Sequence, residues 1–405
     1  MPICDASKPT SQNKTRRLAI ILMRQATHLR NNIHIMATFR PTSMLLRHAQ
    51  ARLLMVGSGR MGHIRAKALY GNPRIELCGI VDINIEQAKE LSELYRTPLF
   101  QSIEEAVSTI EATTHLPLDG VVISTPTPTH MSLITAILKT SVKVKTSVAN
   151  KLSIFTEKPV DETAPKTSAL FQICNDRNVN LCCGYQRRFD SSYQALFHQV
   201  NSGAIGSPLA ASIFFGDHPV PSRTFLLQGG ANIISDCSAH DIDYIRWVLN
   251  DEVVSVYATG TSSDDELREA NVIDNATMLM KFSRGTNVTL TLSRGANYGY
   301  DQRCEVFGTE GMATVNNIAE NASELANETG LHRPKWQHSF PQRFETAFAN
   351  EMNAFVDTLL CGTPWPIVEK DCVEVQRICD AALESCETSQ VVHLESGDPL
   401  LAAQI

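Results

Sequence analysis

Residues 52–62 read RLLMVGSGRMG and decide the fold of the first half of the chain. Residues 52–56 are a short apolar run typical of a buried strand, and the glycine-rich turn after them opens into a helical pattern that continues to Tyr70. A second apolar run, residues 77–81, predicts another strand and ends at Asp82. A strand, a glycine turn, a helix and a strand in this order predict a βαβ unit with two parallel strands.

The glycine turn has the G-x-G-x-x-G spacing of a dinucleotide-binding site. Gly57 would allow the tight turn, Gly59 would let the backbone approach a pyrophosphate, and Gly62 would let helix and strand pack closely. The helix N-terminus would face the phosphates, and Asp82 would accept hydrogen bonds from ribose hydroxyls. A carboxylate there repels a 2′-phosphate, so NAD is expected over NADP, with Arg60 as the only nearby basic residue. The alternative is that Asp82 only caps the next helix.

Strands and helices continue to alternate up to residue 184. Residues 121–123 predict a strand that ends in the loop TPTPTH, and residues 154–156 predict another that ends in Glu157-Lys158-Pro159. Loops at the carboxyl ends of parallel strands form the ligand crevice of such a sheet, so both segments are expected beside the cofactor. The alternative is that Lys158 is only a surface charge. Pro159 stops the strand and makes the position rigid, which favours a placed side chain. The pattern predicts an α/β Rossmann domain, doubly wound around a mostly parallel sheet, over residues 51–184.

After residue 184 the pattern changes to apolar, partly alternating runs with few helices between them. These runs lie at residues 210–215, 253–259, 277–282, 288–292, 304–307 and 313–315. They predict an α+β domain of largely antiparallel strands over residues 185–390, followed by a C-terminal tail, residues 391–405. The polar residues 316–342 are expected to form a long surface loop, and residues 344–360 and 372–386 to form helices.

The stretch GGANIISDCSAHDIDYIRW, residues 229–247, carries the candidate chemistry. Helical spacing puts the apolar Ile242, Ile245 and Leu249 on one side and Asp236, His240, Asp243 and Trp247 on the opposite side. A carboxylate and an imidazole one turn apart suit a general base and a partner that fixes its tautomer. The alternative is an exposed Asp–His pair on a solvated helix face. No third ligand stands at recognisable spacing, so no metal site is expected.

The composition is that of an ordinary soluble globular protein. The chain has 405 residues, of which 43% are hydrophobic and 20% charged, enough for two or three domains. The formal net charge of −7 argues against a nucleic-acid surface, and no apolar run is long enough to span a membrane. The 11 cysteines are odd in number and contain no CxxC pair, which indicates reduced core thiols in a reducing compartment.

The first 50 residues differ from the rest in charge. They contain eight Lys or Arg residues and a single acid, Asp5. Three interpretations stay open: a mitochondrial transit peptide, a disordered tail, or sequence upstream of a later start such as Met36. We exclude the segment from fold reasoning and expect a cytoplasmic protein, or a mitochondrial one if the segment is a transit peptide.

Together these motifs resemble the Gfo/Idh/MocA oxidoreductases over about residues 51–390. The motifs are GSGRMG at 57–62, TPTPTH at 125–130, EKP at 157–159 and the GG-x5-D-x3-HD-x-D core that begins at residue 229. Two weaker stretches look like the inositol dehydrogenase branch of the family. They are GYQRRFD at residues 184–190 and SRGANYGYDQR at residues 293–303.

The resemblance implies a Rossmann domain followed by a domain on a large open sheet, which commonly forms the subunit contact of a homo-oligomer. It implies that Lys158 binds the reacting hydroxyl and the nicotinamide region, that His240 is the acid–base group, and that Asp236 orients His240 or binds a substrate hydroxyl. Arg187 and Tyr298 are the candidate substrate contacts. Cofactor contacts are expected from Gly57, Gly59, Arg60, Met61, Gly62, Asp82, Thr125, Thr127, His130, Glu157 and Lys158.

We therefore expect an NAD(P)-dependent oxidoreductase acting on CH–OH donors, which oxidises a secondary hydroxyl of a small cyclic polyol or sugar, with myo-inositol as the first candidate. The alternatives are another sugar or dihydrodiol dehydrogenase, a non-catalytic NAD(P)-binding sensor, and a hydrolase that uses tightly held NAD. Residues 139–153 depart from the family pattern and look about ten residues too long. They are either a tolerated surface insertion or an error in the gene model.

Overall fold

The structure, a computed structural model, describes residues 50–140, 152–227 and 232–394. Several sequence predictions therefore lie outside the described residues. They concern the N-terminal extension up to residue 49, residues 141–151 of the long segment, the glycine pair at 229–230, and the end of the chain from residue 395. Within the described residues, no helix combines the length and the apolar character that crossing a membrane requires.

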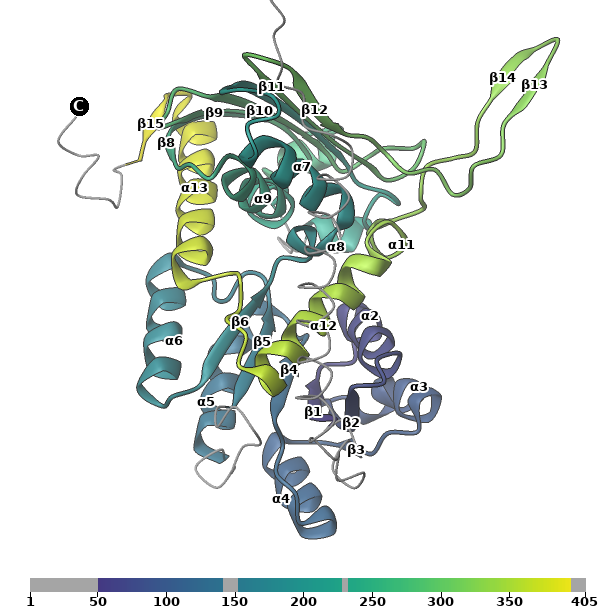
Figure 1. Cartoon of the computed structure of the whole chain (residues 1–405), viewed down its shortest axis with the longest axis vertical. Helices are drawn as coiled ribbons and strands as arrows, with labels where there is room; N and C mark the ends of the chain where they lie inside the picture. The colour runs from purple at the N-terminus through teal and green to yellow at the C-terminus, as the bar shows by residue number, and fades with distance from the viewer. Residues whose placement is uncertain (1–49, 141–151, 228–231, 395–405) are drawn as a thin grey trace, which may run out of the picture. The chain divides into compact units, whose positions relative to one another are not determined.

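Six strands form the first sheet, in the order β3–β2–β1–β4–β5–β6, and all neighbours are parallel (Figure 1). The strands are β1 (Ala51–Val56), β2 (Ile75–Val81), β3 (Leu99–Phe100), β4 (Gly120–Ile123), β5 (Ser153–Glu157) and β6 (Asn180–Gly184). The helices between them are α2 (Arg60–Tyr70), α3 (Ile85–Tyr95), α4 (Ile103–Thr114), α5 (His130–Thr140) and α6 (Ala164–Asp176). Every residue of β1 is buried, as expected for a strand covered on both faces. The predicted Rossmann architecture is confirmed.

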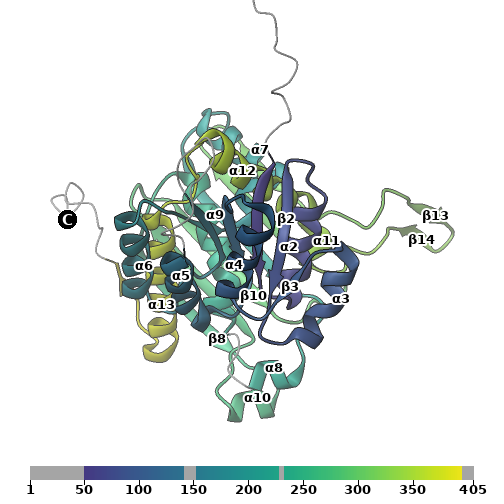
Figure 2. The same cartoon turned by 90° about the horizontal axis from the view of Figure 1, so that it is seen from below.

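Helices α2 and α3 pack against each other, and Figure 2 shows them side by side when the fold is seen from below. Helix α2 starts directly after the glycine turn, with Gly59 as its N-cap residue. Helix α3 starts at Asn84, whose side chain accepts a hydrogen bond from the Gln87 amide. Both helices therefore begin beside the carboxyl ends of β1 and β2, where the sequence predicts the dinucleotide.

Seven strands form the second sheet, in the order β12–β11–β7–β10–β9–β8–β15. They are β7 (Pro208–Gly216), β8 (Val253–Thr261), β9 (Asn275–Phe282), β10 (Asn287–Ser293), β11 (Asp301–Gly308), β12 (Met312–Val315) and β15 (Val392–His393). All neighbours are antiparallel except β7 and β10, which are parallel. The predicted α+β domain with a mostly antiparallel sheet is therefore confirmed.

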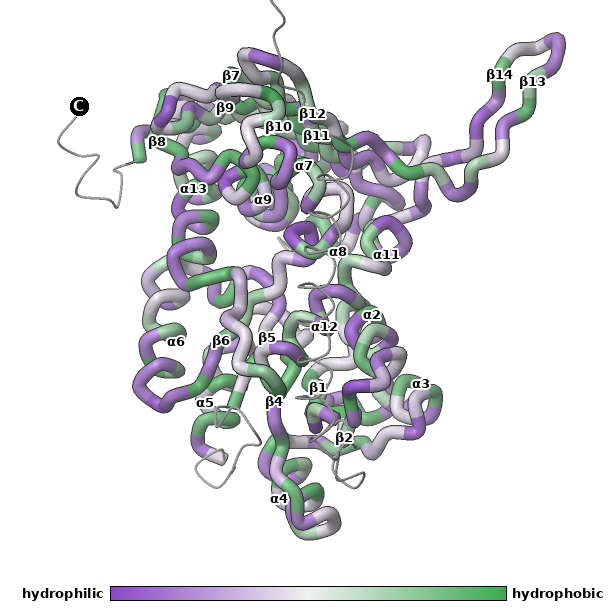
Figure 3. Tube along the Cα trace, viewed as in Figure 1, coloured by the Kyte–Doolittle hydropathy of each residue, from purple (hydrophilic) through white to green (hydrophobic). Residues whose placement is uncertain are grey.

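The second sheet buries one face and leaves the other open. In β9 the buried residues Met278, Met280 and Phe282 alternate with exposed ones, which is the period of a half-covered strand. The buried face is covered by α7 (Ser191–Asn201), α9 (Ala239–Leu249) and α13 (Glu369–Thr388) (Figure 1). Hydrophobic and hydrophilic residues alternate along α13, as an amphipathic helix on a sheet requires (Figure 3).

Two parts of the C-terminal region differ from the sequence prediction. The expected surface loop, residues 316–342, contains a short exposed hairpin of β13 (Leu325–Asn327) and β14 (Gly330–His332), seen as an extended arm in Figure 1. The expected tail contains β15, which pairs with β8 at the edge of the second sheet. The sequence prediction missed both because strands of two or three residues carry almost no periodicity.

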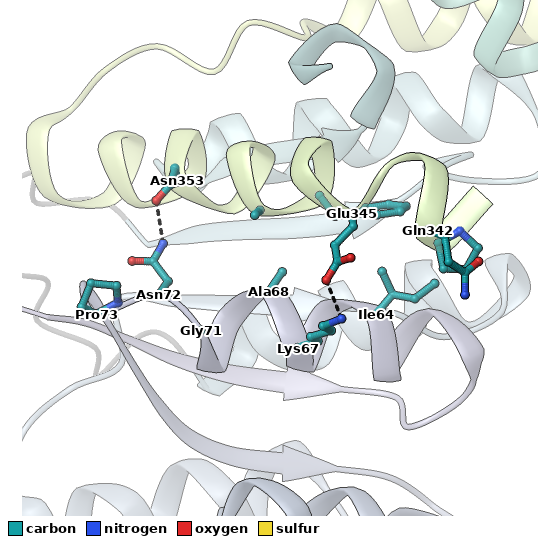
Figure 4. A pocket seen from close by; sticks show the side chains of 12 residues that line it. Ile64, Lys67, Ala68, Gly71, Asn72, Pro73, Gln342, Glu345 and Asn353 are labelled. Atoms are coloured by element: carbon teal, nitrogen blue, oxygen red, sulfur yellow. Dashed lines mark hydrogen bonds and ion pairs between the residues drawn. The ribbon is translucent and has the colours of Figure 1, made fainter. Parts of the chain in front are cut away.

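Helix α12 (Glu345–Cys361) leaves the second sheet and packs on the Rossmann sheet, where it contacts α2, β1 and β5. Figure 4 shows α2 and α12 side by side, joined by an ion pair of Lys67 with Glu345 and by a hydrogen bond of Asn72 with Asn353. A cavity of about 420 Å³ lies between these two helices. The chain therefore crosses back to the N-terminal layer after residue 344, although the sequence placed this helix with the second domain.

Candidate active site

The glycine turn has the geometry of a phosphate-binding turn. Gly57 has a φ of 99°, and a Cβ there would lie 2.8 Å from the carbonyl oxygen of Ser124, so only glycine fits. A Cβ at Gly62 would meet the Gly57 carbonyl, which explains the close approach of helix and turn. A Cβ at Gly59 would meet no atom within 4 Å, which leaves room for a ligand at the start of α2. These residues fit a bound dinucleotide.

Asp82 supports this turn from the end of β2. Its Oδ2 accepts hydrogen bonds of 2.7 Å from both the backbone NH and the hydroxyl of Ser58, and its Oδ1 accepts one from the Asn84 amide. The cap of α3 is Asn84, so the alternative that Asp82 is the helix cap is wrong. Asp82 is half-buried, and its carboxylate stands beside the turn where a ribose is expected.

The TPTPTH loop contributes two threonines to the site and one buried histidine beneath it. Thr125 and Thr127 border the main cavity. His130 is fully buried, with Nδ1 3.1 Å from the Pro159 carbonyl and Nε2 3.0 Å from the Thr125 carbonyl. The structure thus places His130 behind the cavity wall, where it ties this loop to the segment after Lys158, and not among the side chains that line the cavity.

A cavity of about 590 Å³ lies where the carboxyl ends of the Rossmann strands meet the second sheet. Nine of the predicted site residues line it: Arg60, Met61, Thr125, Thr127, Glu157, Lys158, Arg187, Asp236 and His240. The three glycines, Asp82, His130 and Tyr298 do not. Arg60 stacks on the Phe340 ring, 4.4 Å from its centroid, and donates a hydrogen bond to Ser339. Within the described residues no group of three or more His, Cys, Asp or Glu side chains is arranged to hold a metal.

Lys158 and Asp236 are joined to each other in the lining of this cavity. The ammonium of Lys158 donates a 2.8 Å hydrogen bond to Oδ1 of Asp236 and a 2.6 Å bond to its backbone carbonyl. Burial alone would lower the pKa of Lys158, but the Asp236 carboxylate raises it above the usual value. Lys158 is therefore a cation at neutral pH.

Arg294 holds the other oxygen of the same carboxylate. Its Nη2 donates a 2.8 Å bond to Oδ2 of Asp236, and its Nη1 donates a 3.2 Å bond to Asp217. Burial would raise the pKa of Asp236, but the cations Lys158 and Arg294 together hold it well below the usual range. Asp236 is thus a permanent anion between two cations. Neither Arg294 nor Asp217 was predicted from the sequence, although Arg294 stands inside the quoted stretch 293–303.

His240 stands apart from this network. Its Nδ1 is buried and has no hydrogen-bond partner among the described residues, and the ring of Tyr185 lies edge-on to the imidazole with centroids 6.0 Å apart. Burial, and then the charges of Lys158 and Arg187, lower the pKa of His240 well below 6.5, so the ring is neutral. No hydrogen bond joins it to Asp236. The expectation that Asp236 orients His240 is therefore not met in this structure, because Lys158 and Arg294 occupy both carboxylate oxygens.

Helix α9 is buried on almost every side. Asp241 and Asp243 are fully buried and pair with Arg187 and Arg188, at N–O distances of 2.5 and 2.6 Å. GYQRRFD thus supplies two guanidinium groups that neutralise these carboxylates. Asp236 and His240 are half-buried and line the cavity, so the alternative of an exposed pair on a solvated helix face is not met. Arg187 also reaches the cavity wall, as predicted for a substrate contact.

Tyr298 lies outside the cavity. Its side chain is about half exposed (52%), and its hydroxyl donates a 2.8 Å hydrogen bond to Asp301. Tyr300, two residues later, is buried and lines the cavity instead. The structure therefore places Tyr300, and not the predicted Tyr298, among the residues that line the cavity. Gly299 lies between them with a φ of 121°, and this local backbone geometry was invisible in the sequence pattern.

A buried charge cluster lies behind Glu157 and was also missed. The Arg65 guanidinium of α2 bonds to Glu157 at 2.5 Å and to Glu351 of α12 at 2.6 Å. It lies between the rings of Phe155 and Phe348, 4.5 and 4.9 Å from their centroids. The Arg65 and Glu351 side chains are fully buried, so this cluster joins α2, β5 and α12 directly behind the cavity.

We expect Glu351→Gln to make the protein more stable than the wild type above pH 7. Burial and, after the opposing charge of Arg65, the neighbouring Glu157 raise the pKa of Glu351 from 4.5 to about 7. The folded state thus holds the proton more tightly than the unfolded chain. This contribution to stability is complete below about pH 4.5 and is lost as the pH rises through 7, a loss on the order of 3 kcal/mol. Gln carries no charge and avoids that loss.

Urea unfolding of both proteins at pH 5 and pH 8 measures this effect. Glu345→Gln is the matched control, because Glu345 lies on the same helix in an exposed pair with Lys67. The control should leave the fall in stability between the two pH values unchanged. An equal fall in the Glu351→Gln variant would contradict the assignment of a buried, titrating carboxyl.

The sequence matches two family models that together cover most of the described fold. Residues 51–185 match the model described as an oxidoreductase family with an NAD-binding Rossmann fold, and residues 193–314 match the GFO/IDH/MocA C-terminal domain. An inositol 2-dehydrogenase of Rhizobium meliloti (strain 1021) is 30% identical over 335 residues, which are 82% of this chain and 96% of that enzyme.

Solved structures agree with the sequence match. A myo-inositol dehydrogenase of Corynebacterium glutamicum ATCC 13032 superposes with a TM-score of 0.76 at 28% identity, over 86% of this chain and all of that one. The scyllo-inositol dehydrogenase of Lactobacillus casei with bound NAD(H) and scyllo-inositol has a TM-score of 0.75 at 26% identity, over 85% and 99%. Fold, site and similarity define an oxidoreductase with an NAD-binding Rossmann domain, which confirms the predicted enzyme class. The chain belongs to the Gfo/Idh/MocA family.

Proposed function

We propose that this protein is an NAD-dependent dehydrogenase that oxidises a secondary hydroxyl of a cyclic polyol, with myo-inositol as the first candidate. One observation carries the proposal: a cationic Lys158 and a neutral His240 line the same cavity as the predicted cofactor contacts. The names of the relatives, inositol dehydrogenases with myo- and scyllo-inositol among them, support inositol as the polyol.

The proposed chemistry divides the work between the two side chains. The bound nicotinamide supplies the hydride acceptor. His240 is neutral and its Nδ1 is buried, so Nε2 is the nitrogen that takes the hydroxyl proton as general base. Lys158 stabilises the negative charge that develops on the carbinol oxygen, and Asp236 keeps its ammonium in place. We propose that Arg187 and Tyr300 bind the other hydroxyls, because both line the cavity.

Absorbance of reduced nicotinamide, with NAD and a panel of inositols and sugars, tests this function. Build-up of NADH with an inositol is the expected result. NADH formed only with another sugar or a dihydrodiol would move the assignment to a different dehydrogenase. Product without NADH would indicate a hydrolase with tightly held NAD, and the absence of both would indicate a sensor.

We propose NAD over NADP as the cofactor, because Asp82 would lie against a 2′-phosphate and repel it. We expect Asp82→Ser to raise kcat/KM for NADP relative to NAD by about tenfold or more, the scale of losing one like-charge contact of 1–2 kcal/mol. Steady-state kinetics with both cofactors measure the ratio. Asn84→Ser, which changes the true cap of α3, is the control and should leave the ratio unmoved. An unchanged ratio in Asp82→Ser would remove Asp82 from ribose recognition.

We also propose that the protein is a homo-oligomer that pairs through the open face of the second sheet. That face exposes large apolar side chains, among them Tyr257, Leu279 and Phe307, at 38, 46 and 51% exposure. Light scattering of the wild type and of Leu279→Glu tests this; a monomeric wild type would contradict it.

The ten cysteines of the described residues are all free thiols, which supports the proposal of a cytoplasmic location.

A further inference from the structure

Arg294 lines the cavity but was assigned no role from the sequence. It follows β10 directly, its side chain is only 5% exposed, and it reaches Asp217 after β7 and Asp236 before α9. The guanidinium thus bridges two carboxylates from two different elements. A planar guanidinium that donates one hydrogen bond to each of two carboxylates fixes the orientation of both partners.

The contact with Arg294 decides which side chains the Asp236 carboxylate can bind. With Oδ1 on Lys158 and Oδ2 on Arg294, the carboxylate makes no hydrogen bond to His240, although the two residues are one helical turn apart. The charged groups facing His240 are Lys158, Arg187, Asp236 and Arg65. Burial and the three cations lower the pKa of His240 and keep the imidazole neutral, whereas Asp236 is the one of these groups that favours its protonation.

We propose that Arg294 is a positioning residue that keeps His240 an unprotonated base, because it holds the Asp236 carboxylate on Lys158 and away from the imidazole. This inference rests on the proposed dehydrogenase function and adds a residue to it. Without Arg294, the four charges of Lys158, Asp236, Arg294 and Asp217 no longer cancel. The site gains one negative charge, and a negative charge in a buried site strengthens the binding of a proton by a neighbouring histidine.

Arg294→Gln tests the proposal through two readouts. The acidic limb of the pH profile of kcat/KM should move up by about one pH unit, a tenfold change in proton affinity. The pH titration of the His240 imidazole, followed by NMR, should move in the same direction, with the signal identified by its loss in His240→Asn. Arg303→Gln is the matched control, because Arg303 pairs with Asp301 outside the cavity with half of its side chain exposed.

Arg294→Lys keeps the charge and is expected to leave the His240 titration within a third of a pH unit of the wild type, a twofold change. It serves as the readout if Arg294→Gln does not fold, and a full one-unit shift in Arg294→Lys would then contradict the proposal. An unmoved titration in folded Arg294→Gln, with proton uptake at Asp217 instead, would overturn it. So would a rise in polyol KM alone, since Arg294 would then be a substrate ligand. Inactivity of the wild type toward every polyol would refute the proposed function. The NMR titration needs no turnover, so it would still test the role of Arg294.

Discussion

Lys158→Ala is expected to lower kcat for polyol oxidation by about a hundredfold or more, the scale of losing one charged group that stabilises a developing oxyanion. The loss should fall mainly on kcat, because the ammonium matters most when negative charge forms on the carbinol oxygen. The variant also leaves the Asp236 carboxylate paired with Arg294. Steady-state kinetics at saturating NAD and polyol measure the effect.

Lys166→Ala is the control for this experiment. Lys166 lies on α6 with about half of its side chain exposed and pairs with Glu162, remote from the cavity. It should keep wild-type turnover. Quenching of protein fluorescence on cofactor titration shows whether Lys158→Ala still binds the dinucleotide. Near-wild-type turnover in a variant that still binds cofactor would remove Lys158 from the mechanism.

His240→Ala is expected to lower kcat by a similar factor, about a hundredfold or more, because general-base help is lost. In the wild type the pKa of His240 lies well below the usual histidine range, because burial and then the charges of Lys158 and Arg187 disfavour the imidazolium. The base is therefore active at neutral pH, and its activity falls only as the pH drops through the lowered pKa. The variant should lose this acidic limb and become flatter with pH.

His198→Ala is the matched control for the histidine. His198 is an exposed residue of α7 that does not line the cavity, and its ring meets Phe197 edge-on. It should leave both turnover and the pH profile unchanged. A His240→Ala variant that keeps the wild-type acidic limb would show that another group is the base.

The elements of both sheets could be predicted from local patterns. Apolar runs, the glycine turn and the two-residue alternation after residue 184 each act within a few residues, so the sequence alone indicates strand, turn and helix. The sequence also indicated Gly57, where the turn permits no side chain, and Lys158, which directly follows a strand at the ligand edge. Local patterns failed where the element was very short, as in β13, β14 and β15.

Helical spacing correctly predicted that Asp236 and His240 would stand one turn apart, but it assigned the wrong partner. Asp236 bonds to Lys158, which is 78 positions away, and to Arg294, which is 58 positions away. Tyr300 replaced Tyr298 at the cavity for a similar reason, because the turn at Gly299 decides which ring is buried.

The sequence by itself determined the class of fold, the dinucleotide turn, and the presence of Lys158, Asp236 and His240 as candidates for one site. Only the tertiary structure decided which of these charged side chains pair with each other. Arg65 and Glu351, 286 positions apart, meet because α12 returns to the Rossmann sheet, and Arg294 meets Asp236 because β10 ends beside the start of α9. Ion pairs of this kind depend on which surfaces pack together, and no spacing along the chain encodes that choice.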